Sequence, residues 1–111
     1  MMRRQERNVT KSGATQSEEV NVSEYEKAFV VVKLDGASSR DTATLKIYGS
    51  AASSSPVYGE MISSVRLTDD TPSAHHIDVR GVALLKVEAS RVSGGSVTFQ
   101  IGTFGTTRFG P

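Results

Sequence analysis

The stretch "EASRVSGGSVTFQIGTF", residues 88–104, decides the fold class, because apolar and polar residues alternate on both sides of two glycines. A period of two is typical of a β-strand that buries one of its faces. Gly94 and Gly95 can take the positive φ that a two-residue turn between strands requires. We therefore interpret the stretch as a hairpin of two core strands.

The same alternation recurs from residue 28 onward and predicts further strands separated by turns. Short strands at this spacing are typical of antiparallel sandwiches and jelly rolls, so we expect an all-β chain, a single antiparallel β-sandwich or jelly roll of about six to eight strands. Within 59–67 the alternation places Met61 on the inner face and Ile62 on the outer face. The residues expected to face each other between two sheets are Leu45, Ile47, Val65, Leu67, Leu85, Val87, Val97, Phe99 and Ile101.

Length and composition restrict the function further. The chain has 111 residues, enough for one domain with one modest core. A formal net charge of +1 gives no overall field, so neither nucleic acid nor a membrane is expected as a partner. There is no cysteine, which excludes disulfides and thiolate metal sites. The polar start has no apolar run of signal-peptide length, so we expect synthesis in the cytoplasm without export.

The two ends differ in composition from the middle of the chain. Residues 1–22 are polar and predict an extended N-terminal arm, 23–104 the β-sandwich domain, and 105–111 a short C-terminal tail. Basic side chains at the tip of the arm and an aromatic in the tail are the candidate partner-binding residues. The alternatives are a solvated arm and a frayed terminus. The candidates are Arg3, Arg4, Arg7, Lys11 and Phe109.

The segment "TDDTPSAHHIDVRG", residues 68–81, concentrates the groups that could bind a metal or act in catalysis. His75 and His76 are adjacent, so in a strand they point to opposite faces and cannot share one ion without a bend. We interpret the segment as a polar turn with an Asp-rich strand end; a calcium site at Asp69 and Asp70 and a catalytic His/Asp pair are the alternatives. The sequence has no nucleophile elbow and no P-loop lysine, so no catalytic, cofactor or metal residue is assigned, no cofactor is expected, and the chain is not expected to be an enzyme.

Three stretches carry a resemblance to a known group: "VVVKLDGASSRDTATLKIYGS" (30–50), "PVYGEMISSVRLTDD" (56–70) and "IDVRGVALLKVEASRVSGGSVTFQIGTF" (77–104). Their order and pattern resemble the small β-sandwich virion structural proteins of tailed bacteriophages, the capsid decoration or cement type. The chain departs from part of that group in lacking a tryptophan beside the Asp-Gly turn, where Ala37 and Ser38 stand.

The resemblance implies a non-enzymatic virion protein that binds neighbouring major capsid proteins, or another virion protein, through its terminal arms. It also implies a homo-oligomer located in the virion, and it carries over no functional residues. The alternative is a carbohydrate- or receptor-binding module of a tail, head fibre or cell-surface assembly. Exposed aromatics would be needed there, and the candidates are Tyr25, Tyr48 and Tyr58.

Overall fold

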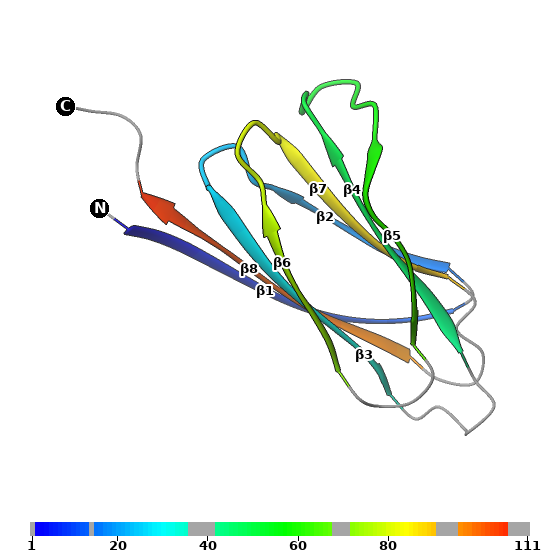
Figure 1. Cartoon of the computed structure of the whole chain (residues 1–111). Helices are drawn as coiled ribbons and strands as arrows, with labels where there is room; N and C mark the ends of the chain where they lie inside the picture. The colour runs from blue at the N-terminus through cyan, green and yellow to red at the C-terminus, as the bar shows by residue number, and fades with distance from the viewer. Residues whose placement is uncertain (1, 14, 36–41, 68–71, 91–95, 107–111) are drawn as a thin grey trace.

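The computed structural model describes residues 2–13, 15–35, 42–67, 72–90 and 96–106, and these residues form strands joined by turns and loops. The strands build two four-stranded antiparallel sheets that pack face to face (Figure 1). The predicted all-β sandwich is confirmed. The strands are β1 (Met2–Ser12), β2 (Thr15–Asn21), β3 (Lys27–Asp35), β4 (Ala43–Ser50), β5 (Gly59–Leu67), β6 (Ser73–Asp78), β7 (Leu84–Ser90) and β8 (Ser96–Thr106).

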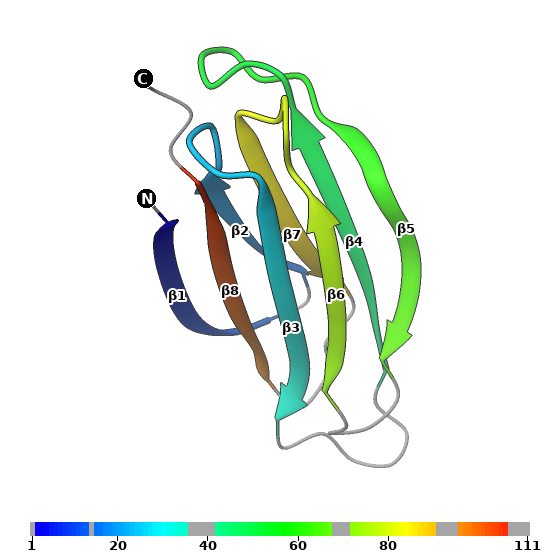
Figure 2. The same ribbon diagram turned by 60° about the vertical axis from the view of Figure 1, so that its left-hand side comes forward.

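The strand order is that of a jelly roll. One sheet, the front sheet, has the order β1-β8-β3-β6, and the other, the back sheet, has the order β2-β7-β4-β5 (Figure 2). Consecutive strands lie in opposite sheets, except for β4 and β5, so the chain crosses between the layers at almost every connection. This double Greek-key arrangement is one of the two architectures that the sequence predicts.

The predicted hairpin at residues 88–104 is wrong. β7 pairs with β2 and β4, whereas β8 pairs with β1 and β3, so the two strands belong to different sheets. Alternation identified both strands correctly. A glycine pair, however, indicates only that the chain reverses direction, and it does not indicate which sheet the next strand joins. The turn residues themselves, 91–95, lie outside the described residues.

The inward-facing side chains of both sheets form one core. Phe99, Leu45 and Leu85 are fully buried at its centre. Every residue predicted to face inward is buried except Val65, which is partly buried and packs against the core. The buried residues that alternation also places inside are Ala43, Ile77, Val79 and Ala89; the continuous apolar run of β3 adds Ala28, Val30, Val32 and Leu34.

A β-bulge in β5 corrects the prediction for this strand. Leu45 pairs with Val65, but Ile47 pairs with Ile62, so the register shifts between these two pairs. An extra residue in one strand reverses which face the following side chains occupy. Ile62 therefore packs against the core, while Met61 is 37% exposed.

Residues 2–12 and 15–21, expected to be an arm outside the sandwich, form two of its strands. β1 pairs with β8 and β2 pairs with β7, each along its whole length. Val20 and Val22 are buried in the common core. The expected tail likewise begins within β8, because Gly105 and Thr106 still pair with β1. The sandwich is thus larger than the predicted 23–104, because the last strands provide edges for the first two.

An ionic cluster closes the corner between β1 and β2. Arg7 and Lys11 lie on the inner face of β1, opposite buried residues of β8, and both form ion pairs with Glu18 of β2, at 2.6 and 3.4 Å. The Arg7 guanidinium also donates to the carbonyl of Glu19 at 2.9 Å, and the Lys11 ammonium donates to the carbonyl of Ser17 at 2.6 Å. Charged groups thus join the two layers where β2 forms the edge of its sheet.

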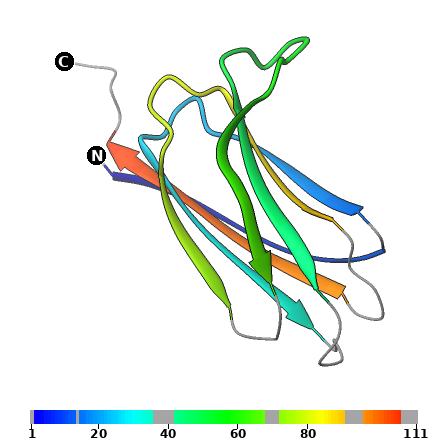
Figure 3. The same ribbon diagram turned by 45° about the vertical axis from the view of Figure 1, so that its right-hand side comes forward.

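Three loops lie together at the end of the sandwich where β1 begins: 22–26, 51–58 and 79–83 (Figure 3). The β4–β5 loop, 51–58, protrudes furthest, and Val57 in it is 84% exposed. Backbone hydrogen bonds connect the other two loops to each other and to the sheets. They are Val22 N to Ala83 O (2.9 Å), Ala83 N to Ser50 O (2.8 Å), Glu26 N to Phe104 O (3.2 Å) and Val79 N to Glu26 O (2.9 Å).

Candidate binding site

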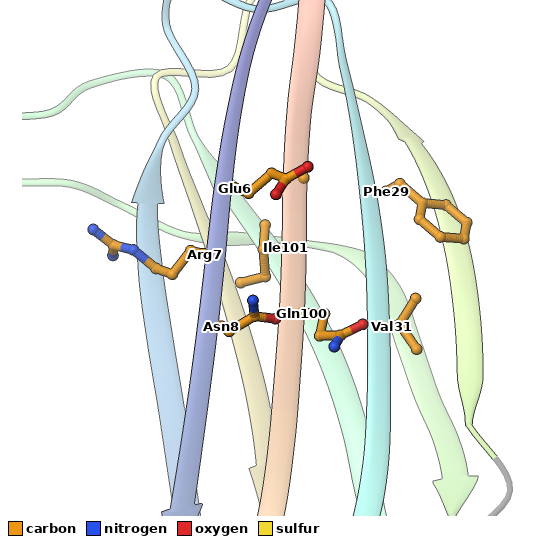
Figure 4. A pocket seen from close by; sticks show the side chains of 8 residues that line it. Glu6, Arg7, Asn8, Phe29, Val31, Gln100 and Ile101 are labelled. Atoms are coloured by element: carbon orange, nitrogen blue, oxygen red, sulfur yellow. The ribbon is translucent and has the colours of Figure 1, made fainter.

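A hollow lies on the outer face of the front sheet, where β8 carries no side chain. In one row across the sheet Glu6 pairs with Gly102, and Gly102 pairs with Phe29. A Cβ added at Gly102 would have no heavy atom within 4 Å, so the space above this backbone is open. The hollow has a volume of about 330 Å³ (Figure 4). This is at the small end of the range for ligand pockets.

Polar amides form one side of the hollow, which we call the Gly102 hollow. Asn8 of β1 and Gln100 of β8 face each other in the next row, followed by Val31 of β3. Figure 4 shows the Gln100 amide over the sheet between Asn8 and Val31, and the Glu6 carboxylate extending over β8. Neither the Asn8 nor the Gln100 side chain bonds to another described residue. Both amides can therefore donate and accept hydrogen bonds toward a ligand.

An aromatic pair forms the other side. The Phe29 ring packs against the ring of His76 on β6, with 4.6 Å between ring centroids and a tilt of 45°. Figure 4 shows the Phe29 ring extending from β3 toward β6, so this contact holds the ring in one orientation at the β6 side of the hollow. The hollow thus brings together an aromatic side chain, an aliphatic side chain and two amides that have no hydrogen-bond partner among the described residues.

The two adjacent histidines diverge, as their spacing predicts. His76 is exposed on the outer face, whereas His75 is half-buried on the inner face, with its Nε2 2.7 Å from the Ser73 hydroxyl. They do not form a shared ligand pair. Among the described residues, no group of three or more His, Asp or Glu side chains is arranged to hold a metal ion. Asp69 and Asp70, the possible calcium ligands, lie outside the described residues.

The predicted partner-binding residues fall into two groups. The structure brings Arg7 and Lys11 together around Glu18, so both already have partners within the chain. Arg3 and Arg4 lie at the start of β1, where their backbones pair with Gly105 and Phe104. Phe109 lies outside the described residues.

The tyrosines predicted as aromatic platforms lie elsewhere. Tyr25 packs against the core, while Tyr48 and Tyr58 meet edge to face on the outer face of the back sheet, 6.5 Å apart. The Lys86 ammonium lies 5.5 and 5.1 Å from their ring centroids, so a cation of the chain itself occupies this pair. Burial, and then the carboxylate of Glu19, raise the pKa of the Tyr58 hydroxyl.

Two carboxylates on the front sheet have lowered pKa values. A hydrogen bond from the Thr98 hydroxyl, followed by the ammonium of Lys33 at 3.1 Å, lowers the pKa of Asp35. Hydrogen bonds from Arg80 lower the pKa of Asp78 to about 2. Both groups are ionised at neutral pH, so neither is suited to act as a general acid.

Four residues of the hollow are not among the candidate site residues predicted from the sequence: Asn8, Phe29, Gln100 and Gly102. One signal was available: Gly102 lies inside β8, and a glycine inside a strand often marks the close approach of a ligand or of another backbone. The missing knowledge was which strands flank β8, because the hollow is made by three strands far apart in the sequence.

No protein-family model and no curated protein matches the sequence. Solved structures share the fold. The pili of Bacillus endospore appendages align over 96% of this chain and 88% of theirs, with a TM-score of 0.59 and 9% identity. The SPBc2 prophage-derived protein YomS aligns over 92% of this chain and 95% of its own, with a TM-score of 0.59 and 15% identity.

A third similar structure is chitosan-binding module 1 of the chitosanase/glucanase from Paenibacillus sp. IK-5. It aligns over 86% of this chain and 74% of its own, with a TM-score of 0.53 and 10% identity. At these identities the likenesses establish a shared small β-sandwich fold and no specific family. Within the described residues there is also no helix long and apolar enough to cross a membrane.

Proposed function

We propose that this chain is a non-enzymatic structural protein of a phage virion, of the capsid decoration or cement type. The fold likeness to a prophage-derived protein extends over nearly the whole of both chains, which supports this assignment. The sequence resemblance to small phage sandwich proteins points the same way. The observation that carries the proposal furthest is the free edge of β1.

β1 is an edge strand whose eleven residues pair with β8 in one continuous register. The other three edge strands are less suited to pairing with a further strand. β6 has only six residues, and β5 contains a bulge. In β2, two backbone carbonyls already accept hydrogen bonds from Arg7 and Lys11. A long regular edge presents unpaired backbone groups to which a neighbouring chain can add a strand. The proposed partner is a major capsid protein or another copy of this chain.

Basic residues lie at one end of this edge. Arg3 and Arg4 are near the start of β1, so the partner surface is expected to be acidic where it meets that end of the strand. The likeness to pili fits a structural role, although the absence of cysteine means that this chain cannot be linked as those disulfide-linked pili are.

The test compares charge-reversal variants in binding to capsid shells that lack the protein. Arg3→Glu/Arg4→Glu should lose attachment and remain folded, and wild-type attachment should weaken with salt, since exposed charges are screened over about 8 Å at physiological ionic strength. Arg66→Glu, on β5 at the opposite edge, is the control and should attach like the wild type. If the double variant binds shells as tightly as the wild type, or the wild type binds none, the proposal is wrong.

The Gly102 hollow favours a second candidate function, a carbohydrate- or receptor-binding module of a tail, head fibre or cell-surface assembly. Its aromatic wall and amides are the groups that such modules use, and a chitosan-binding module shares the fold. A glycan array with purified protein tests this candidate. Signals at background for all glycans would remove it.

A further inference from the structure

We propose that the Gly102 hollow binds one unit of a neutral saccharide; this inference rests on the second candidate function and identifies its site and ligand class. The hollow combines the two kinds of surface that a pyranose ring presents. Its C–H faces are apolar, and its rim carries hydroxyl groups. The hollow likewise has an apolar side, formed by Phe29 and Val31, and a polar side, formed by the amides of Asn8 and Gln100 and by the carboxylate of Glu6 (Figure 4).

The apolar side can hold the C–H face of a sugar. Phe29 is half-buried, and its ring rests against His76, so little side-chain freedom remains to be lost when a ligand packs against it. Val31, two residues along the same face of β3, extends this apolar surface toward the amides. The aromatic wall and the aliphatic side chain thus border the same open space.

The polar side can bind the hydroxyl groups. The Asn8 and Gln100 amides face each other across the β1–β8 pair and have no hydrogen-bond partner among the described residues. An amide offers both donors and an acceptor, which matches a hydroxyl that both donates and accepts. A neutral sugar is favoured because the two amides have no charge, and the charged residues that also line the hollow, Glu6 and Arg7, have opposite signs.

Gly102 makes the site possible. A side chain at this position would stand between Glu6 and Phe29, its neighbours in the same row, in the space that the sugar ring is proposed to occupy. Because a Cβ there meets no atom within 4 Å, a side chain can begin at this position without displacing any part of the fold. A substitution at Gly102 therefore separates ligand binding from folding.

The experiment follows amide chemical shifts of the full chain by NMR during titration with cellohexaose, chitin hexaose and maltohexaose. Wild-type protein should show saturable shifts around Phe29, Gln100 and Gly102 with at least one of these oligosaccharides. Gly102→Val should abolish the shifts, and its melting temperature should stay the same or rise, since valine favours strands. Gly59→Val is the matched control: Gly59 is also a strand glycine whose Cβ would meet nothing within 4 Å.

A second variant tests the polar side. Gln100→Ala should weaken binding by about threefold to tenfold, the loss expected for one or two hydrogen bonds between neutral groups. Unchanged binding by Gly102→Val, equal loss in Gly59→Val, or no wild-type shifts with any of the three sugars would overturn the proposal. Gly102→Val leaves the free edge of β1 intact and should attach to shells like the wild type, so failure of the virion proposal would be seen separately.

Discussion

Two glycines of β8 differ in how much space lies beside their backbone, and this space determines whether each position tolerates a side chain. Gly105 and Gly102 lie three residues apart in the same strand. A Cβ at Gly105 would lie 2.8 Å from the backbone nitrogen of Glu26, which donates a hydrogen bond to the carbonyl of Phe104 at 3.2 Å. At Gly102 the corresponding space is open. One glycine is therefore required for packing, whereas the other leaves room for a ligand.

Gly105→Ala should lower the free energy of unfolding by about 1 to 3 kcal/mol, the usual cost of forcing an extra methyl group into a packed site. The methyl group would push the 22–26 loop away from β8 and weaken the bond between Glu26 and Phe104. Urea denaturation monitored by circular dichroism measures the change. Gly102→Ala is the control and should change stability by less than about 0.5 kcal/mol; equal effects of the two variants would contradict this explanation.

Asp35 gives the domain a predictable dependence on pH. Its pKa is lowered in the folded state, so its contribution to stability is complete above the ordinary value of 3.8 and is lost as pH falls through the folded value. Thr98→Val removes the main cause and should raise the pKa of Asp35 toward 3.8.

The difference in unfolding free energy between the wild type and the Thr98→Val variant should thus be larger at pH 6 than at the acidic end of the titration. An NMR titration of the Asp35 carboxyl group, with denaturation at both pH values, measures this. Thr44→Val, on the back sheet, serves as the control and should show no such pH dependence. An Asp35 pKa that is the same in wild type and Thr98→Val would refute the assignment.

At the scale of elements, alternation predicted β3 to β8 but not β1 and β2. Those two strands have charged residues at inward positions, Arg7 and Lys11 on β1 and Glu18 on β2. Because charged side chains usually face water, such a pattern predicts a solvated segment. The structure neutralises these charges against each other at the rim of the sandwich. Patterns along one strand cannot show this, because the partner charge lies on a different strand.

Glu18→Ala should destabilise the domain by about 1 to 2 kcal/mol, between the values typical of surface and buried ion pairs. The Glu18 side chain is only 13% exposed, and its removal leaves the charges of Arg7 and Lys11 together without a carboxylate. Thermal and urea denaturation measure the effect. Glu60→Ala, which removes a 48% exposed partner of Lys46, should cost less than about 0.5 kcal/mol, and an equal loss in both variants would contradict the role of the cluster.

For the whole molecule, the sequence predicted the fold class and almost all of the core, because both depend on which face of a strand is apolar. It did not predict the connection from β7 to β8 or the Gly102 hollow, because these depend on which strands become neighbours. The bulge in β5 is an intermediate case: the strand was predicted, but the side chain that packs inward changed from Met61 to Ile62.

Deleting residues 1–22 should abolish cooperative unfolding of the domain. The deletion removes β1 and β2, two buried valines and the edge partners of β8 and β7, a loss comparable with the roughly 5 to 15 kcal/mol that stabilises a typical domain. Calorimetry of the truncated chain measures this. A sharp transition within a few degrees of the full-length protein would show that the sandwich is complete without its first two strands.

The positions of β7 and β8 also determine when the protein can fold during its synthesis. Each lies inside its sheet, between a strand from the start of the chain and one from its middle. β1 and β2 therefore leave the ribosome long before their partner strands, β8 and β7, have been synthesised. They remain unpaired while the rest of the chain is translated. Neither sheet can close until the final strands emerge, so a nascent chain that stalls before residue 96 still lacks the strand that joins β1 to β3. Folding of this domain is accordingly expected to be completed only after translation has passed its last strand.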